Sequence, residues 1–354
     1  MAVTRTADVT NQISTIWSKR LLAQAEKLTF WHGLEGPVGS SMPVVRYDDL
    51  EKDQGDTVKF DIVLALTGSG MSGDNELLEG NEEKMKFRQS SFTVESLQHA
   101  VRWSKKGKIL INHDMRGSAL GQLRKWLASQ LDDAVWYEIT GESHATNSLL
   151  SGSTTLPTTA KWFAGTATAV AGVDDTDAAG RLTLDDISSI KSYAKVNNKI
   201  EPIALANGEE VYMLIVHDYA GLKLKQSSDW KQAQREARER GRDNPVFTGA
   251  LGVWDNVIIK QSDRVPVKSD GAGSVAVARN VFVGAGALGR GYAYHPDWTE
   301  EYFSYGQEQG IATFTILGEK LIVFDLTSAG GAAAADFTAL GSMVLYSAAV
   351  SPAA

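Results

Sequence analysis

The chain has 354 residues, of which 43 are acidic and 35 basic, so its net charge is −8. An acidic chain is poorly suited to tight nucleic-acid binding, because neutralisation of phosphate charge dominates that affinity. There is no cysteine, which excludes disulfides, cysteine-ligated zinc, iron–sulfur clusters and thiol nucleophiles.

The first 45 residues predict a helix followed by an extended segment. Apolar residues recur at helical spacing over 11–30, and the sequence WHGLEGPVGSSMPVV at 31–45 favours an extended chain. This region has little local sequence to pack on, so we expect it to gain order through contacts with other molecules. The first residues lack the apolar run of a secretory signal, and no apolar run is long enough to span a bilayer.

Two alternating apolar and polar runs, TVKFDIVLA at 57–65 and KMKFRQSSFTV at 84–94, predict a hairpin over about 56–95. The acidic, glycine-rich connection is several times longer than the roughly two to five residues that a hairpin turn needs. A hairpin this long cannot bury its own faces, so we expect it to lie on another surface; the alternative is a flexible hairpin without a partner. Its polar face carries Lys59, Lys84, Lys86 and Arg88, and its tip carries Asp74, Glu76, Glu79, Glu82 and Glu83.

The strongest helix in the sequence is predicted at 114–140. Leucines at helical spacing form one stripe, at Leu120, Leu123, Leu127 and Leu131. Asp114 stands at the position of an N-cap, and Gly141 stands where a glycine commonly ends a helix. We therefore predict one continuous helix that is amphipathic along its whole length.

Downstream of this helix the sequence predicts a mixture of elements. Residues 148–181, rich in Ser, Thr, Gly and Ala, indicate a long loop or a small insertion. Thr183 is a predicted N-cap with two acidic residues in the turn that follows, and a polar helix is predicted at 228–241. Strands are predicted at 211–217, 253–260, 275–283, 310–317 and 320–326. Helices and strands interleave irregularly, which predicts an α+β fold.

One glycine motif is typical of an enzyme. In VFVGAGALGRGYAY (281–294), Gly284, Gly286 and Gly289 match GxGxxG directly after a predicted strand. A dinucleotide site needs this turn to open a helix whose N-terminus receives the pyrophosphate. Gly291 and Pro296 leave room for only about two helical turns, so we favour a glycine-lined turn packed against a core.

The other patterns that suggest chemistry also have structural explanations. Asp175, Asp177, Gly180 and Asp186 match part of a calcium loop, but a helix cap preceded by an acidic loop explains the same residues. The six histidines are scattered without a metal-binding pair, and the nucleophile-elbow and Walker motifs are absent. Arginines at 235–242 alternate with acidic residues, as on an ion-paired exposed helix. We therefore expect no catalytic residue, no cofactor and no metal.

Several longer stretches of the sequence are informative when they are taken together in chain order. They are WSKRLLAQAEKLTFW (17–31), GDTVKFDIVLALTGSGMSGDNELLEGNEEKMKF (55–87), RWSKKGKILINHDMRGSALGQLRKWLASQLDDAVW (102–136), VYMLIVH (211–217), RNVFVGAGALGRG (279–291) and YGQEQGIATFTILGEKLIVFD (305–325). In this order they resemble the tailed-bacteriophage major capsid protein family, in a podovirus-type branch. Two segments depart from it. The family pattern has an alanine-rich helix near 284–291, which the extra glycines weaken here, and 148–181 matches no part of the family.

The resemblance implies an α+β fold with four parts. These are an N-terminal arm at 1–50, an extended hairpin loop at 51–104, a peripheral domain at 105–200 and an axial domain at 201–309. The peripheral domain contains the spine helix 114–140 and is joined by C-terminal strands at about 310–354. The hairpin loop would lie on a neighbouring subunit, where its acidic tip can meet basic groups. Candidates for these groups are Lys105, Lys106, Lys108 and Arg116.

The function implied by the resemblance is a major capsid protein that assembles into the icosahedral shell around a tailed phage's double-stranded DNA. Expected partners are copies of the same chain in hexameric and pentameric capsomers, together with scaffolding, portal and decoration proteins. The DNA would be enclosed without sequence-specific binding, no membrane would be involved, and the shell would assemble in the bacterial cytoplasm to form the virion. Two alternatives stay open: an encapsulin-like cellular compartment with the same fold, or a nucleotide-dependent enzyme using Gly284–Gly289.

Overall fold

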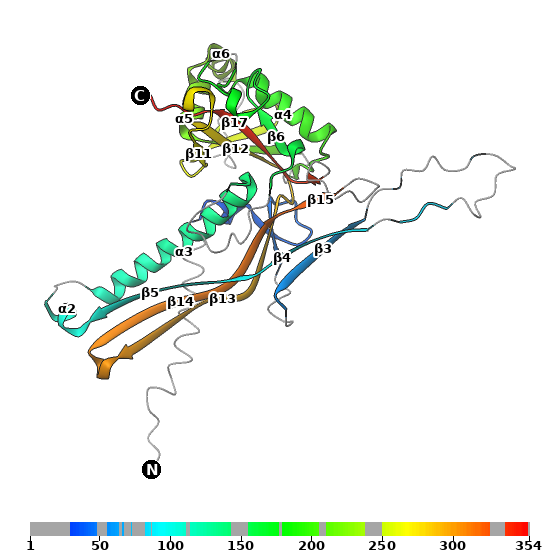
Figure 1. Cartoon of the computed structure of the whole chain (residues 1–354). Helices are drawn as coiled ribbons and strands as arrows, with labels where there is room; N and C mark the ends of the chain where they lie inside the picture. The colour runs from blue at the N-terminus through cyan, green and yellow to red at the C-terminus, as the bar shows by residue number, and fades with distance from the viewer. Residues whose placement is uncertain are drawn as a thin grey trace.

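The computed structural model describes residues 29–47, 55–63, 66, 72, 82–85, 87–110, 114–142, 155–176, 179–204, 210–237, 250–325 and 337–352. Within these ranges the chain forms an elongated five-stranded sheet, a more compact eight-stranded sheet and two separate two-stranded ribbons (Figure 1). Helices and strands alternate irregularly along the sequence, so the α+β prediction is confirmed. The helix predicted at 11–30 lies almost entirely outside the described residues.

The elongated sheet is built around one long hairpin. Its strand order is β1 (Glu35–Pro37), β2 (Val44–Tyr47), β13 (Leu288–Phe303), β14 (Glu308–Leu321) and β5 (Glu95–Ser104). β13 and β14 pair antiparallel over almost their whole length. The strand predicted at 310–317 is part of the longer β14. β15 (Val323–Asp325) follows β14 and pairs with β16 (Phe337–Ala339). A strand, and not a helix, therefore follows the glycine motif, because the chain after the turn enters the sheet.

Helix α3 (Met115–Thr140) connects the two sheets and confirms the predicted continuous helix. Gly141 ends it with φ 65°, in the left-handed region that favours glycine. Asp114 is the N-cap residue, although its side chain makes no capping hydrogen bond. The first part of α3 packs on β5, β13 and β14, and its last turns pack beneath the eight-stranded sheet.

The compact sheet has six strands in its main path. They are β6 (Lys161–Phe163), β17 (Ser342–Ala348), β12 (Val277–Val283), β8 (Glu210–Val216), β10 (Val257–Gln261) and β9 (Ala250–Trp254). β11 (Val267–Lys268) pairs with β12, and β7 (Ile203–Ala204) pairs with β8. β8 and β12 confirm two predicted strands, and both are buried on their two faces, which is why they read as continuous apolar runs.

The single strand predicted at 253–260 is wrong. The segment forms the end of β9, a two-residue turn and most of β10, with Trp254 paired to Val257. Asp255 and Asn256 both have positive φ, at 48° and 58°. Two left-handed central residues are typical of the type I′ turn that closes a tight hairpin, and Asp and Asn tolerate that conformation.

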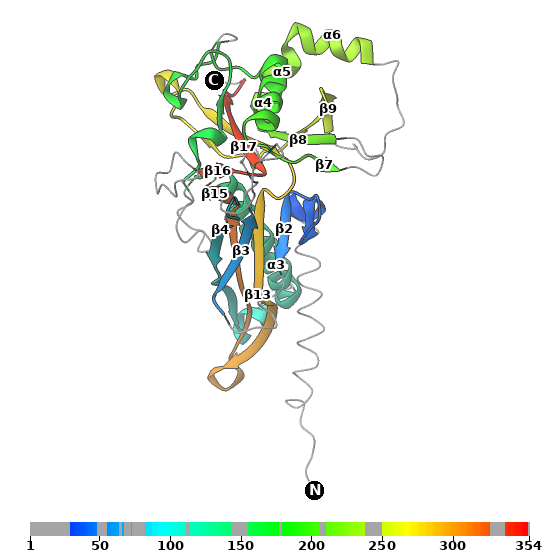
Figure 2. The ribbon, with the colours of Figure 1, turned by 90° about the vertical axis from the view of Figure 1, so that its right-hand side faces the viewer.

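Three helices accompany the compact sheet: α4 (Leu184–Val196), α5 (Asp218–Gln226) and α6 (Ser228–Ala237). Figure 2 shows α4 and α5 beside β8 and β17, and the buried side chains of α4, α5 and α6 share one core with both strands. Thr183 caps α4 as predicted. Its hydroxyl accepts from the Asp186 backbone N–H at 3.2 Å, and the Asp186 carboxylate accepts from the Thr183 backbone at 3.0 Å.

Residues 29–47, which the sequence assigned to an arm, lie within the fold. The short helix η1 (Trp31–Leu34) places Trp31 against Trp136 of α3, with ring centroids 4.9 Å apart. The backbone N–H of Phe30 donates to both carboxylate oxygens of Asp132 at 3.0 Å. The segment therefore packs within its own subunit, which the sequence did not predict, because its partners α3 and β13 come from far along the chain. The rest of the expected arm, 1–28 and 48–50, lies outside the described residues.

The low-complexity region also contributes to the fold. β6 pairs in parallel with β17, and Leu156, Ala160 and Val173 are buried in the main core. Helix α4 and strand β8 share a core, so the boundary expected near residue 200 falls inside one packed layer.

Candidate interaction surface

The predicted long hairpin is a separate ribbon made by β3 (Thr57–Val63) and β4 (Phe87–Thr93). Paired residues share a face, so Lys59 lies with Ser91 and Asp61 lies with Gln89. Arg88 pairs with Ile62 and therefore lies on the opposite face from Lys59. The sequence had placed both basic residues on one polar face. The register contradicts this. Lys59 pairs with Ser91, and Arg88 is three positions from Ser91 on β4. Residues an odd number of positions apart on a strand point to opposite faces.

The end of the ribbon at Phe92 and Thr93, which we call its root, packs on β13 and β14. Gly289, Gly291 and Gly318 make this close approach possible. Phe92 is buried, and its ring lies 6.4 Å from that of Tyr47, edge to face. A Cβ at Gly291 would lie 3.0 Å from Phe92, and a Cβ at Gly318 would overlap the carbonyl oxygen of Thr93. Gly291 and Gly318 are cross-strand partners, so together they form a flat seat for the ribbon.

Beyond this root, the ribbon exposes apolar side chains. Val63 and Phe87 are cross-strand partners and are 55% and 61% exposed. Leu66 follows β3 and Met85 precedes β4 in the sequence, and they are 65% and 62% exposed. We call Val63, Leu66, Met85 and Phe87 the ribbon patch. The sequence contained a signal for it, since Val63 is an apolar residue on the face that otherwise carries Thr57, Lys59 and Asp61.

The charged residues predicted for the hairpin tip are only partly described. Glu82, Glu83 and Lys84 are exposed, and Arg88 is half-buried on β4. Asp74, Glu76, Glu79 and Lys86 lie outside the described residues.

The predicted partner surface lies at the other end of β5. Lys105, Lys106 and Lys108 are exposed on the short helix α2 (Lys105–Leu110). β5 has ten residues and therefore separates α2 from β4 by about 33 Å. Figure 1 shows α2 and β4 at opposite ends of β5. One subunit therefore cannot bring its own ribbon tip to its own α2 without leaving the root contacts.

Helix α2 also has an apolar side. Ile109 and Leu110 are 74% and 72% exposed, and they line a pocket of about 440 Å³ with Lys105 and Lys106. Arg116 differs from the three lysines, because its guanidinium donates to Glu300 of its own chain at 2.6 and 2.9 Å. The hydrogen bond to Glu300 raises the pKa of Arg116. Arg116 is therefore already engaged within the subunit.

The sites considered from sequence for a metal or cofactor have structural roles where they are described. Asp175 forms ion pairs with Arg181 at 3.0 Å and Lys223 at 3.4 Å, and Asp186 closes the α4 cap; Asp177 is not described. The described ranges contain no cluster of three His, Asp or Glu side chains that could hold a metal ion. A dinucleotide site at Gly284–Gly289 lacks its helix, since β13 begins at Leu288. Among the described helices, none combines the length and apolar character needed to cross a membrane.

Comparison with known proteins gives a consistent result. The chain is 27% identical over 346 residues to the major capsid protein of Pseudomonas phage KPP25, covering 89% of this chain and 90% of that one. Its structure is similar to the capsid of Ralstonia phage GP4, with a TM-score of 0.76, 23% identity and 92% of each chain covered. It is also similar to the capsid of cyanophage Pam1, with a TM-score of 0.73, 18% identity, and 90% and 92% covered.

These two structures have the tailed-phage capsid fold, which confirms the fold that the sequence resemblance implied. The sequence pattern described as phage capsid protein matches residues 5–351, almost the whole chain. The chain therefore belongs to the phage capsid protein family.

Proposed function

We propose that this chain is the major capsid protein of a tailed bacteriophage and that its copies assemble into the closed icosahedral shell around the DNA. The observation that carries the proposal is the ribbon patch, an exposed apolar surface on a ribbon whose root is seated on its own subunit. A two-stranded ribbon is marginal by itself, and exposed apolar surface at its far end is typical of an interface. A second copy of the chain is the partner that a shell supplies.

Apolar side chains in such a contact would contribute to the energy of assembly. Burying one large apolar side chain is worth about 1.5–3 kcal/mol, and a shell repeats the contact in every subunit. The exposed Glu82 and Glu83 near the patch would orient the second copy on the ribbon. We propose that they face Lys105, Lys106 and Lys108 of that copy. Each exposed pair is worth only about 0–1 kcal/mol, so the apolar side chains supply most of the contact energy.

The ribbon patch is tested by the double substitution Val63→Ser with Phe87→Ser. The expected result is a folded subunit with an unchanged melting temperature that no longer forms shells in negative-stain microscopy. The matched control is Asp61→Ser with Gln89→Ser, the neighbouring cross-strand pair on the same face, which should assemble normally. Normal shells from the Val63 and Phe87 variant would contradict the proposal. A shell filled with DNA in infected cells, and not with cargo protein, separates a virion from a cellular compartment.

Several finer features are part of the same proposal. The elongated sheet with α3 corresponds to a peripheral domain, the compact sheet to an axial domain and β3–β4 to the extended loop. The shell consists of hexameric and pentameric capsomers, assembles in the bacterial cytoplasm, and works with scaffolding, portal and decoration proteins. The chain acts as a structural protein without catalytic activity, in line with the description of its family as phage capsid proteins.

A further inference from the structure

Charged residues from four separate elements meet beneath β1. Arg290 of β13 is buried, and its Nε donates to Glu319 of β14 at 2.7 Å. The same guanidinium forms an ion pair with Glu35 of β1, and it donates to the carbonyl oxygen of Leu131 in α3 at 3.4 Å. Glu138 of α3 is also buried nearby, and its carboxylate accepts from the Leu321 backbone N–H at 3.1 Å. We call Glu35, Glu138, Arg290 and Glu319 the buried charge cluster.

The cluster contains one guanidinium and three carboxylates. Glu319 carries the greatest penalty, because among the described residues its Oε2 has no hydrogen-bond partner. Burial raises the pKa of Glu319 to about 7; Arg290 opposes the rise, and Glu35 and Glu138 add to it. A buried carboxylate with one unpaired oxygen is far less costly in its neutral form. The cluster is therefore built to hold a proton.

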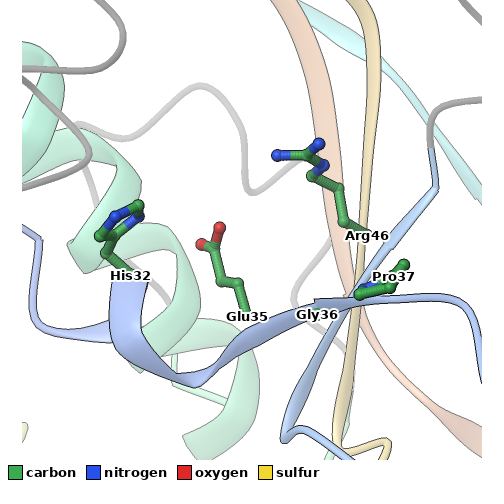
Figure 3. Close-up of a pocket in the computed structure, with 5 residues that line it drawn as sticks. All are labelled: His32, Glu35, Gly36, Pro37 and Arg46. Carbon is green, nitrogen blue, oxygen red and sulfur yellow. The ribbon is translucent and has the colours of Figure 1, made fainter. Parts of the chain in front are cut away.

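Glu35 is the point at which the cluster meets solvent. It lines a pocket of about 320 Å³ with His32, Gly36, Pro37 and Arg46. Figure 3 shows the side chains of His32, Glu35 and Arg46 approaching this pocket from η1, β1 and β2. β1 has three residues and is the edge strand of its sheet, so it has few other bonds to hold it.

Two further cations lie near the cluster among the described residues. Arg46 is partly exposed, and the Arg264 side chain, 37% exposed, faces Asp132 of α3 at 3.5 Å. Solvent screens both cations. Tyr292 of β13 and His32 are further titratable groups near the cluster.

We propose that the buried charge cluster is a proton-dependent latch for residues 29–37. With one proton among the three carboxylates, Arg290 holds Glu35 and keeps β1 on the sheet. Without that proton, Glu319 competes for Arg290 and repels Glu35. The segment 29–37 then opens more often from α3 and β13.

The direction of the pH effect follows from proton binding. Glutamate in water has a pKa of 4.5, and opening lets water reach Glu319. Between pH 4.5 and about 7 the closed form binds more protons than the open form. The opening constant therefore rises with pH in this window, by up to about tenfold per pH unit, and levels off above it. The latch is a property of the single subunit, so it can be tested independently of shell formation.

Hydrogen exchange of the full chain, with exchange times scaled for the intrinsic rate at each pH, tests the latch. From about pH 5 to about pH 7, peptides covering 29–37 should open up to about tenfold more per pH unit, while β17 stays protected. Glu319→Gln keeps the shape and removes the titration, so the slope should disappear. Glu301→Gln, an exposed position on β13, is the matched control and should keep it. A wild type without the slope, or Glu319→Gln with the wild-type slope, would overturn the proposal.

A second variant covers the case in which Glu319→Gln does not fold. Glu35→Gln removes the charge on β1 and leaves the Arg290 and Glu319 pair in place. At about pH 5, peptides covering 29–37 should then open at least about tenfold more than in the wild type, with β17 unchanged. Wild-type protection of 29–37 in this variant would show that Glu35 does not hold the segment, which contradicts the latch.

Discussion

Glycine has a packing role at the root of the ribbon. Gly291 on β13 and Gly318 on β14 lie beneath Phe92, and a Cβ at either position would come within 3.0 Å of the ring. Gly289 on β13 lies beside Phe92 and Tyr47. A glycine within a strand normally weakens it, but here the loss is offset by the close approach of another backbone. In the motif that suggested a phosphate-binding turn, Gly286 makes the turn with φ 63°, and a Cβ at Gly284 would overlap the carbonyl oxygen of Glu201. Gly289 is the motif glycine that lies against the β3–β4 ribbon.

We predict that Gly318→Ala destabilises the subunit by about 1–3 kcal/mol, because the added methyl group must displace the carbonyl of Thr93. Gly121→Ala in α3 is the control. A Cβ there meets nothing within 4 Å, and alanine favours helix, so it should stabilise by about 0.5–1 kcal/mol. Denaturant unfolding measures both values. Changes of the same sign in the free energy of unfolding at Gly318 and Gly121 would contradict the role of Gly318 in seating the ribbon.

A second residue-scale feature lies under β17. Arg279 is buried, forms ion pairs with Glu142 at 2.8 Å and with Asp270, and lies 5.4 Å from the centre of the Tyr346 ring. Burial raises the pKa of Tyr346 to about 12, although Arg279 acts in the opposite direction. The phenol therefore stays protonated in the folded state at a pH where it ionises in the unfolded chain.

This difference in pKa between the folded and the unfolded chain predicts that the stability of the subunit falls at alkaline pH because of the Tyr346 hydroxyl. Between pH 10.0 and about 12 the folded chain binds one more proton at Tyr346 than the unfolded chain. Stability should therefore fall as pH rises, by up to about 1.4 kcal/mol per pH unit from this group. Tyr346→Phe keeps the ring stacked on Phe163 and should flatten that part of the curve. Parallel stability curves for the two proteins over this range would count against the assignment.

At the scale of elements, α3 has two different halves. Up to about residue 130 it follows the predicted stripe, with Leu123 and Leu127 buried and Gln122 and Lys125 exposed. From Leu131 to Thr140 nearly every side chain is buried, including charged ones. The prediction of an amphipathic helix along its whole length is therefore wrong for the second half. This half packs on residues 29–34 and on the compact sheet at the same time.

The first half of α3 provides a test by substitution. Leu123 is buried among Trp103, Trp298 and Ile311, so Leu123→Asp should destabilise the subunit by about 3–5 kcal/mol and lower its solubility. Gln122→Asp, one position earlier and exposed, should cost less than about 1 kcal/mol. Thermal melting and the soluble fraction after expression report both variants. Equal melting temperatures would show that the stripe does not face a core.

At the scale of the whole molecule, the ribbon patch and α2 lie at separate ends of the elongated sheet (Figure 1). Each carries exposed apolar side chains, and the acidic Glu82 and Glu83 near the patch are opposite in sign to the lysines of α2. Contact between them requires two subunits, and a chain of such contacts can close into a shell. The charges near the apolar groups would set the orientation of each contact.

We predict that Glu79→Lys, Glu82→Lys and Glu83→Lys together leave the subunit folded but prevent assembly at low ionic strength. Raised salt should restore assembly, because repulsion is screened beyond roughly 8–10 Å. A chain that also carries Lys105→Glu, Lys106→Glu and Lys108→Glu should assemble at low salt again, since both signs are exchanged. Light scattering and microscopy of the particles measure this. Failure of the six-residue exchange with a normal melting curve would show that these two charge groups are not partners.

The sequence by itself determined the features that depend on near neighbours. The span of α3, the cap at Thr183 and the strands at β8 and β12 follow from spacings of two to four residues and from local hydrogen bonds. The collinear stretches that resemble phage capsid proteins also required no structure. The long acidic connection predicted a hairpin with an external partner, which stays a proposal.

Only the tertiary structure decided which distant residues approach each other. Phe92 on the β13–β14 glycines, Trp31 on Trp136, and Glu35 beside Arg290 join positions up to about 255 residues apart. Local periodicity carries no information on such partners, so residues 29–37 looked like an arm. The glycine motif does form the predicted turn, with Gly286 at φ 63° between β12 and β13, but the sequence did not show that the β3–β4 ribbon packs beside it. The balance of charge in a buried cluster likewise depends on which elements pack together, because burial turns ordinary surface residue types into coupled groups that share a proton.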